Sequence, residues 1–211
     1  MDIFGPGWEG HPEAFFEGWR EVVGDDDLVL VPGDLSWALR LEDALLDLND
    51  IGELPGRKVI LRGNHDYWWP SISKLRASLP EGMFAIQNDA LRFGDLVVCG
   101  TRGWVTPGSH EFSEQDEKIY LRELERLRLS LKAARKLGGE KLIVMLHFPP
   151  ANPRQESSGF TELLLEEKPD VLVFGHVHGD PDYREPELPG IDTHFVAADA
   201  LGFRPRLLLE M

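Results

Sequence analysis

The chain has 211 residues, of which 42% are hydrophobic and 28% are charged, a balance typical of one folded domain spanning residues 1–211. Acidic residues outnumber basic ones by 37 to 22, so the formal net charge is −15. This charge argues against non-specific binding to nucleic acid, which depends on clustered Lys and Arg.

Nothing in the sequence indicates a membrane or an oxidising compartment. No apolar run approaches the ~20 residues that a membrane span requires. The first residues have neither the basic start nor the apolar stretch of a secretory signal, and the single Cys99 cannot form an internal disulfide. We therefore expect a cytoplasmic protein without a membrane partner; the oligomeric state stays open.

Short apolar runs alternate with longer amphipathic stretches along the chain, which predicts a layered α/β fold. Most runs are rich in Val, Ile and Leu and have the length of buried strands. They are Leu28–Pro32, Lys58–Arg62, Phe84–Gln87, Leu96–Gly100, Lys141–His147, Asp170–Phe174, Thr193–Ala197 and Arg206–Glu210.

Three helices are indicated between these runs. His11-Pro12-Glu13 is typical of a helix start. Ser36 is expected to cap a helix over Ala38–Asn49. The clearest helix is Glu114–Leu137, with a capping box of Ser113 and Asp116 before it and glycines after it. Its expected buried stripe is Tyr120, Leu124, Leu127, Leu131 and Ala134. By composition, Pro149–Gly159 and Gly179–Gly190 are loops.

Four polar clusters follow predicted strands at their carboxyl ends, the edge where ligands bind in open α/β sheets. They are Gly33-Asp34, Gly63-Asn64-His65-Asp66, His147, and Gly175-His176-Val177-His178-Gly179. Singly, each has a simpler explanation, such as a turn or a surface histidine. Their shared position favours a joint metal site, because oxygen and imidazole donors bind borderline divalent metals.

The residue types fit a site for two cations. Asp34 can bridge two ions, Asn64 adds a neutral ligand, and three imidazoles, those of His147, His176 and His178, complete the shells. Two ions roughly 3.5–4 Å apart can hold a bridging hydroxide nucleophile and clamp a phosphate during in-line displacement.

Two further residues of the second cluster are candidates for acid catalysis. His65 is placed to protonate the departing oxygen, and Asp66 is expected to orient the His65 imidazole and raise its pKa.

These blocks resemble the calcineurin-like metallophosphoesterase superfamily, whose pattern is Asp-x-His, Gly-Asp, Gly-Asn-His-Asp/Glu, a His after a strand, and Gly-His-x-His. Four of the five blocks stand here in order, from Gly33 to His178. Three neighbouring segments look like a bacterial branch of predicted phosphohydrolases. They are Pro32–Trp37, Tyr67-Trp68-Trp69 and Gly100–Trp104.

The resemblance implies a four-layer α/β/β/α sandwich and a hydrolase of small phosphate esters with two divalent ions, manganese, iron, zinc or nickel. It implies that Asp34 bridges both metals, that Asn64, His147 and His176 bind one, and that His178 binds the other. His65 would be the acid.

The Asp-x-His block of the family, expected on a strand before Asp34, has no match. Asp2 is followed by Ile3 and Phe4, and His11 is expected to cap a helix or lie on the surface. We expect that Met1 is not the natural start, that roughly ten to twenty residues lie upstream, and that this chain lacks the first strand of the fold.

Other functions stay open. The missing block is compatible with a catalytically weak or inactive interaction scaffold, and His-x-His also occurs in amidohydrolases, although there on the first strand. Arg102 is interpreted either as a contact to a substrate phosphate or as part of a structural salt bridge. Trp68 and Trp69 are expected in the core, and Cys99 is expected to be buried.

Overall fold

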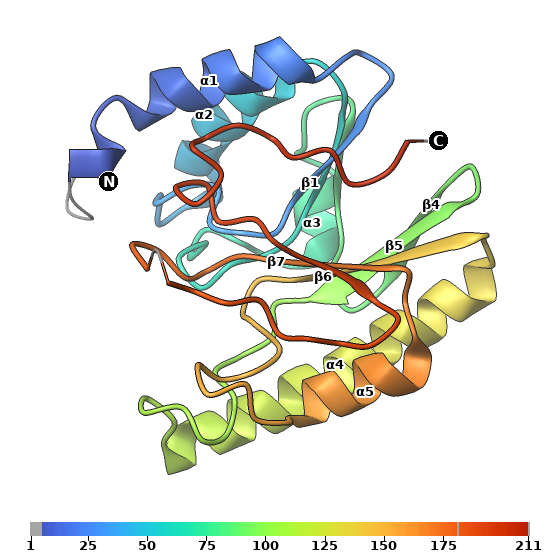
Figure 1. Ribbon diagram of the computed structural model, residues 1–211. Coiled ribbons are helices and arrows are strands. Elements are labelled where there is room, and N and C mark those ends of the chain that lie inside the picture. Colours follow the sequence, from blue (N-terminus) through green and yellow to red (C-terminus); the bar gives the residue numbers. More distant parts are fainter. Residues whose placement is uncertain (1–5, 181, 211) are drawn as a thin grey trace.

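In the computed structural model, which describes residues 6–180 and 182–210, two β-sheets lie face to face between helices (Figure 1). The first sheet is parallel and has the order β1-β2-β3. The second has the order β4-β5-β6-β7-β8, with an antiparallel β4–β5 pair and parallel pairs beyond it. The strands are β1 Leu28–Val31, β2 Arg57–Ile60, β3 Met83–Ala85, β4 Ala90–Phe93, β5 Leu96–Thr101, β6 Lys141–Leu146, β7 Val171–Phe174 and β8 Asp192–Phe195.

Helices cover the outer faces of both sheets. In Figure 1, α1, α2 and α3 lie on the side of the first sheet, and α4 and α5 on the side of the second. Their bounds are α1 His11–Val22, α2 Leu41–Gly52, α3 Ile72–Arg76, α4 Glu114–Leu137 and α5 Gly159–Glu167, with a short 3₁₀ helix η2 at Pro6–Trp8. Because a helix layer lies on each side of the paired sheets, the expected α/β/β/α order is confirmed.

The buried side chains form three clusters, one in each interval between these layers. One packs α2 against β2 and β3, the second lies between the two sheets, and the third joins α4 and α5 to the second sheet. Residues of β2 contribute to two of them, since Ile60 faces the helices and Val59 faces the other sheet. The alternation of side chains along a strand thus explains why this run is apolar throughout.

Parallel pairing brings the carboxyl ends of the strands together. Val31 is level with Ile60 in the first sheet, and Phe174 is level with Phe195 in the second. The loops that follow β1, β2, β6 and β7 therefore emerge along one edge. This register is what allows residues more than 100 positions apart to meet.

Most of the expected elements are confirmed, with differences at three places. Residues 90–93 form strand β4, which the sequence did not indicate, whereas residues 206–210 form no strand although one was expected. Helix α2 begins at Leu41 rather than Ala38, because Ser36 is held in the preceding turn, where its backbone N–H donates to Asp66. Ser36 therefore belongs to the segment before the helix, and the helix itself begins three residues later than expected.

Helix α4 has the expected bounds, with the Ser113–Asp116 capping box in place. Of the expected stripe, Leu124 is only partly buried, while Glu123 and Ser130 are buried polar residues that the apolar pattern did not indicate. Within the described part of the chain, no helix combines the length and the apolar character needed to cross a bilayer.

Candidate metal centre

Side chains from four loops meet at the shared sheet edge. The Nε2 atom of His147, after β6, lies 2.7 Å from Oδ1 of Asn64, which follows β2. The same nitrogen lies 3.4 Å from Oδ2 of Asp34, after β1, and 3.2 Å from Nδ1 of His176, after β7. Ligand atoms of Asp34, His147 and His176 all lie within 4.8 Å of one another. Distant segments thus place four donors around one point.

The donors of this cluster carry lone pairs toward one another, an arrangement that fits a cation. The Nδ1 atom of His147 lies 2.9 Å from the carbonyl oxygen of Pro32, which can only accept, so Nδ1 carries the proton. Its Nε2 is therefore a lone-pair donor, and it faces the oxygens of Asn64 and Asp34. Such convergent acceptors repel one another unless a positive charge lies between them, and carboxylate, amide and imidazole are suitable ligands for divalent metals.

The pKa values of both imidazoles in the cluster are lowered, which suits metal binding. Burial is the main cause that lowers the pKa of His147 to about 3. Burial, reinforced by the neighbouring His147, lowers the pKa of His176 to about 3 as well. Both rings are therefore neutral at physiological pH, the form that binds metals.

The backbone of the cluster is held in unusual conformations. Asp34 and His176 both have positive φ angles, 58° and 75°, which non-glycine residues seldom adopt. A Cβ atom on Gly63 would lie 2.0 Å from Oδ1 of Asp34, so only glycine allows the loops after β1 and β2 to approach this closely. Strain of this kind is concentrated at functional sites, where the surrounding structure maintains it.

Asp66 has a different surrounding from the one expected. Its two oxygens accept hydrogen bonds from the backbone N–H groups of Gly63 (2.7 Å), Asp34 (2.8 Å), Leu35 (3.0 Å) and Ser36 (3.3 Å). The indole of Trp68 donates another at 3.1 Å. The carboxylate is fully buried and joins the loops after β1 and β2. The bonds described thus give Asp66 the role of holding the ligand loops, in place of the expected contact with the His65 imidazole.

The imidazole of His65 instead lies among aromatic side chains. It stacks on the indole of Trp37 with 4.9 Å between ring centroids and 8° between planes, and Tyr67 meets it edge-on at 6.2 Å. Its backbone N–H donates to Oδ1 of Asp34 at 2.8 Å. His65 is thus anchored to a candidate ligand, with its ring plane set by Trp37.

His178 is paired with Asp199, a residue that the sequence analysis missed. Its Nδ1 lies 2.9 Å from Oδ1 of Asp199, whose other oxygen accepts from the N–H of Gly179 at 2.8 Å. Burial alone would raise the pKa of Asp199, but the bonds from His178 and Gly179 lower it below the usual value. An ionised Asp199 accepts a hydrogen bond from Nδ1–H of His178, which fixes the tautomer with the lone pair on Nε2.

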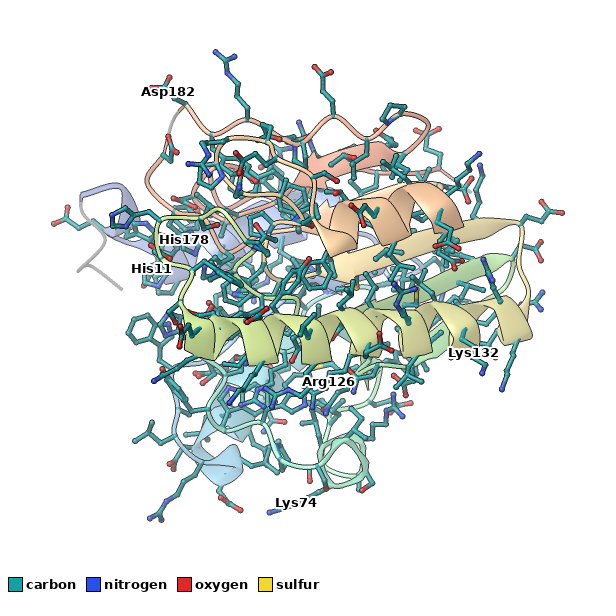
Figure 2. All side chains as sticks on the ribbon, turned by 90° about the horizontal axis from the view of Figure 1, so that it is seen from below. His11, Lys74, Arg126, Lys132, His178 and Asp182 are labelled. Carbon is teal, nitrogen blue, oxygen red and sulfur yellow. The ribbon has the colours of Figure 1, made fainter. Side chains whose placement is uncertain are left out.

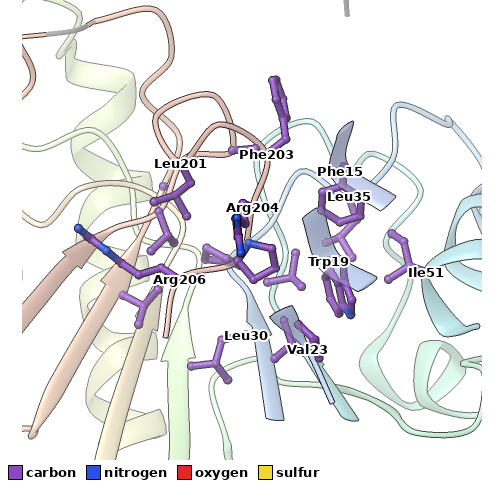
Figure 3. A pocket seen from close by; sticks show the side chains of 18 of the residues that line it. Phe15, Trp19, Val23, Leu30, Leu35, Ile51, Leu201, Phe203, Arg204 and Arg206 are labelled. Carbon is purple, nitrogen blue, oxygen red and sulfur yellow. The ribbon is translucent and has the colours of Figure 1, made fainter. Parts of the chain in front are cut away.

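A cavity of about 1450 Å³ opens beside these residues, and Asp34, His65, His147, His176 and His178 are among those lining it. Figure 3 shows its apolar part, between Phe15 and Trp19 of α1, Leu30 of β1, and the segment from Leu201 to Arg206.

Trp8 and helix α1 form one wall of this cavity, near His178. His11 begins α1 as expected, and its Nδ1 lies 2.8 Å from the carbonyl oxygen of Trp8. The Trp8 ring lies 5.4 Å from that of His11 and 5.3 Å from that of His178, at the end of the molecule where both histidines are labelled in Figure 2.

The remaining candidates from the sequence fall outside this cluster. Trp68, Trp69 and Cys99 are buried in the core, as expected. Arg102 takes part in the structural ion pair considered above, with its Nη2 3.4 Å from Oε1 of Glu123.

The model of the calcineurin-like phosphoesterase family matches residues 7–180. The chain belongs to this family. Membership supports a metal-dependent phosphoesterase, and so a hydrolase, at the level of the family, and the cluster of Asp34, His147 and His176 agrees with metal binding.

Individual relatives are distant. The chain is 27% identical over 176 residues to the Gene 66 protein of Mycobacterium phage D29, and 24% identical over 170 residues to the Gene 66 protein of Mycobacterium phage L5. Each alignment covers 81% of this chain, and it covers 68% and 65% of the two phage proteins, so the chain spans about two thirds of their length.

A solved structure shares the fold at low sequence identity. The protein of unknown function AQ665 from Aquifex aeolicus aligns with a TM-score of 0.50 and 15% identity, over 93% of this chain and 81% of the other. This likeness concerns the fold alone.

Proposed function

We propose that the protein hydrolyses small phosphate esters with two divalent metal ions held at the shared sheet edge. The observation that carries this proposal is the convergence of oxygen and nitrogen atoms of Asp34, Asn64, His147 and His176 on one point. Manganese, iron, zinc and nickel all suit such mixed oxygen and nitrogen donors. When bound, these ions would activate water and stabilise the charge on the phosphate oxygens.

The residues of the site have different roles in metal binding, proton donation and positioning. Asn64, His147 and His176 would hold one ion, His178 would contribute to holding the second, and Asp34 would contribute to both. The His65 imidazole would donate a proton to the departing oxygen. Trp37 keeps that ring in plane, and the Asp34 contact to the His65 backbone fixes the distance between acid and ligand. Asp66 fixes the two loops that carry Asp34 and Asn64.

A second candidate function is an interaction scaffold with the fold of the family but little or no turnover. The geometry that favours it is the uneven ligand supply, since His178 lies outside the tight group of Asp34, His147 and His176. A scaffold needs the fold but not the ions.

Metal analysis combined with turnover tests the two functions. The purified chain is loaded with Mn²⁺, Fe²⁺, Zn²⁺ or Ni²⁺, passed through a desalting column, and examined for metal content and for hydrolysis of aryl phosphate mono- and diesters. About two ions per chain with turnover that a chelator abolishes is the expected result. No bound ion and no hydrolysis would favour the scaffold.

A further inference from the structure

A second, smaller cavity lies on the same sheet edge, between the two sheets and α4. Its volume is about 50 Å³, room for little more than one tetrahedral anion. The residues that line it follow β2 and β3, end β5, or face inward from α4. They are Leu61, Arg62, Ile86, Gln87, Asn88, Thr101, Arg102, Glu123 and Arg126.

The charges in this cavity do not balance. Among the described residues lining it are three arginines, Arg62, Arg102 and Arg126, and one carboxylate, Glu123. The carboxylate of Glu123 is fully buried. It accepts hydrogen bonds from Arg126 at 2.6 Å, Thr101 at 2.8 Å and Arg102 at 3.4 Å. The cavity therefore carries an excess of about two positive charges in a chain whose net charge is −15.

Two of the guanidinium groups have hydrogen-bonding capacity left over. The Nε atoms of Arg62 and Arg102 are buried and have no hydrogen-bond partner among the described residues. A buried donor without a partner costs about 1–3 kcal/mol, and more when it is charged. Three guanidinium groups around one small cavity also repel one another. An anion in the cavity would satisfy the donors and offset the repulsion at once.

Arg102 is also held in place. Its guanidinium lies 4.4 Å from the ring centroid of Trp104, so the indole supports one face of the planar group. Arg126 reaches the cavity from α4, where Figure 2 shows it. Arg102 and Arg126 are thus held by Glu123 and Trp104, and Arg62 approaches the same cavity from the loop after β2, so the site is largely preorganised.

The cavity adjoins the candidate metal centre through the backbone. Arg62 precedes Gly63 and Asn64 directly, and the carbonyl oxygen of Arg102 accepts from the N–H groups of His147 and Phe148, both at 3.0 Å. Two arginines of this cavity are therefore linked by the chain or by backbone hydrogen bonds to the loops that carry Asn64 and His147, which is the ground for placing a second phosphate of the substrate here.

We propose that Arg62, Arg102 and Arg126 bind a phosphate group, and that this group is a second phosphate of the substrate. The substrates selected are then small molecules with two phosphates. The choice of substrate rests on the function proposed above, whereas phosphate binding at the cavity does not.

Phosphate binding is tested on the metal-free full chain, in which the metal centre cannot retain the anion. Titration calorimetry with inorganic phosphate should show binding that Arg62→Gln weakens about tenfold or more, since a hydrogen bond to a charged group contributes about 1.5–3 kcal/mol. The matched control is Arg128→Gln, an exposed arginine of α4 that pairs with Glu125, and it should bind phosphate like the parent. No binding to the parent, or equal binding by Arg62→Gln, would overturn the proposal.

Two more variants separate anion binding from a structural role. Glu123→Gln removes the negative charge of the cavity, so phosphate should bind several-fold more tightly; weaker binding by this folded variant would contradict the site. Arg62→Lys keeps the charge but loses the planar fork, so it should bind with intermediate affinity. It also provides a folded comparison if Arg62→Gln unfolds, and parent-like binding by Arg62→Lys would then overturn the role of the guanidinium.

Turnover distinguishes a substrate phosphate from free phosphate. Alkane-α,ω-diol bisphosphates with two to six carbons measure the spacing, and the matching monophosphates are the controls. In Arg62→Gln, the KM of at least one bisphosphate should rise about tenfold while its kcat and the KM values of the monophosphates stay unchanged. Equal changes for both series would overturn the substrate assignment. A chain that binds phosphate but hydrolyses nothing would refute the proposed function alone.

Discussion

Asn64, His147 and His176 lie in a packed group with Asp34, whereas His178 lies outside this group, although Asp34, His147, His176 and His178 all line the cavity of about 1450 Å³. The first group is held by backbone contacts on several sides, such as the bond of His147 to the Pro32 carbonyl and the bonds of Asp66 to the ligand loops. The other side of the site is that of His178, which is positioned by Asp199 and contacts the ring of Trp8.

This difference predicts unequal affinities for the two proposed ions. A set of donors that is already assembled needs no reorganisation, so the ion shared by Asp34, Asn64, His147 and His176 should bind more tightly. The ion at His178 gains fewer ligands from the described residues. The two sides can therefore be separated by variants that affect one of them first.

The largest expected effect comes from the packed side of the site, that is, the group of Asp34, Asn64, His147 and His176. His147→Ala removes a ligand whose nitrogen faces the three other donors, and turnover should fall roughly 10³-fold, because a Lewis-acid ion contributes several kcal/mol and 1.4 kcal/mol corresponds to a factor of ten. Metal content by mass spectrometry and aryl phosphate hydrolysis measure the effect. His110→Ala, at an exposed loop position, is the control. Unchanged metal content and turnover in His147→Ala would remove this side from the site.

Much of the packed side could be predicted from the sequence. Asp34, Asn64, His147 and His176 each follow an apolar run, and parallel strands place such residues along one edge. From the sequence, the neighbouring glycines could be interpreted as turn residues. The close contact between Gly63 and Asp34 could not be predicted, because it depends on how the two loops pack. The role of Asp66 was missed for the same reason, since its partners lie some 30 residues earlier in the chain.

The other side was less visible in the sequence. Asp199 comes after β8, so its place at a strand end was a signal, but no motif marks it and His178 lies 21 residues before it. The run at 206–210 has the composition of a strand, yet a strand also needs a neighbour with free N–H and C=O groups. A local pattern does not show whether that neighbour is present. Strand β4 is short and follows β3 closely, so its run was not distinguished from a turn.

The next effect concerns His65, whose backbone N–H donates to Asp34. His65→Ala should retain both ions and lose about 10²–10⁴-fold in kcat, the usual contribution of a positioned proton donor. Substrates with acidic leaving groups, such as nitrophenol, need less protonation and should lose less activity than alkyl phosphates. An equal loss for both leaving groups would contradict the role of proton donor. Trp37→Leu keeps the imidazole but removes its stacking partner, and should give a smaller loss.

A smaller effect is expected on the His178 side. Asp199→Asn should weaken the second ion about 10–100-fold, the usual effect of removing a group that orients a ligand histidine, and leave the first ion nearly unchanged. Metal titration with two resolved affinities measures this, and Asp182→Asn, at an exposed loop position, is the control. Asp199→Glu should restore part of the affinity. Equal weakening of both ions in Asp199→Asn would show that the two sides are not independent.

The smallest effect is the pH dependence of the metal-free fold, which tests the packed side without any ion. The pKa of His147 is about 3 in the folded chain and close to 6.5 in the unfolded chain, so between these values the unfolded state binds one more proton. The free energy of unfolding therefore rises with pH in this window, by about 1.4 kcal/mol per pH unit for this residue. His176 contributes in the same direction, and Asp66 in the opposite one, because burial raises its pKa to about 6.

Comparing variants isolates the contribution of His147, since the other titrating groups are common to both chains. Urea unfolding in the presence of a chelator, from pH 4 to pH 6, should give a slope against pH that is smaller in His147→Gln than in the parent by about 1.4 kcal/mol per unit. His110→Gln, at an exposed loop position, is the control and should keep the slope of the parent. Equal slopes for the parent and His147→Gln would mean that His147 is accessible to protons in the folded chain, and the packed side would then be as open as the side of His178.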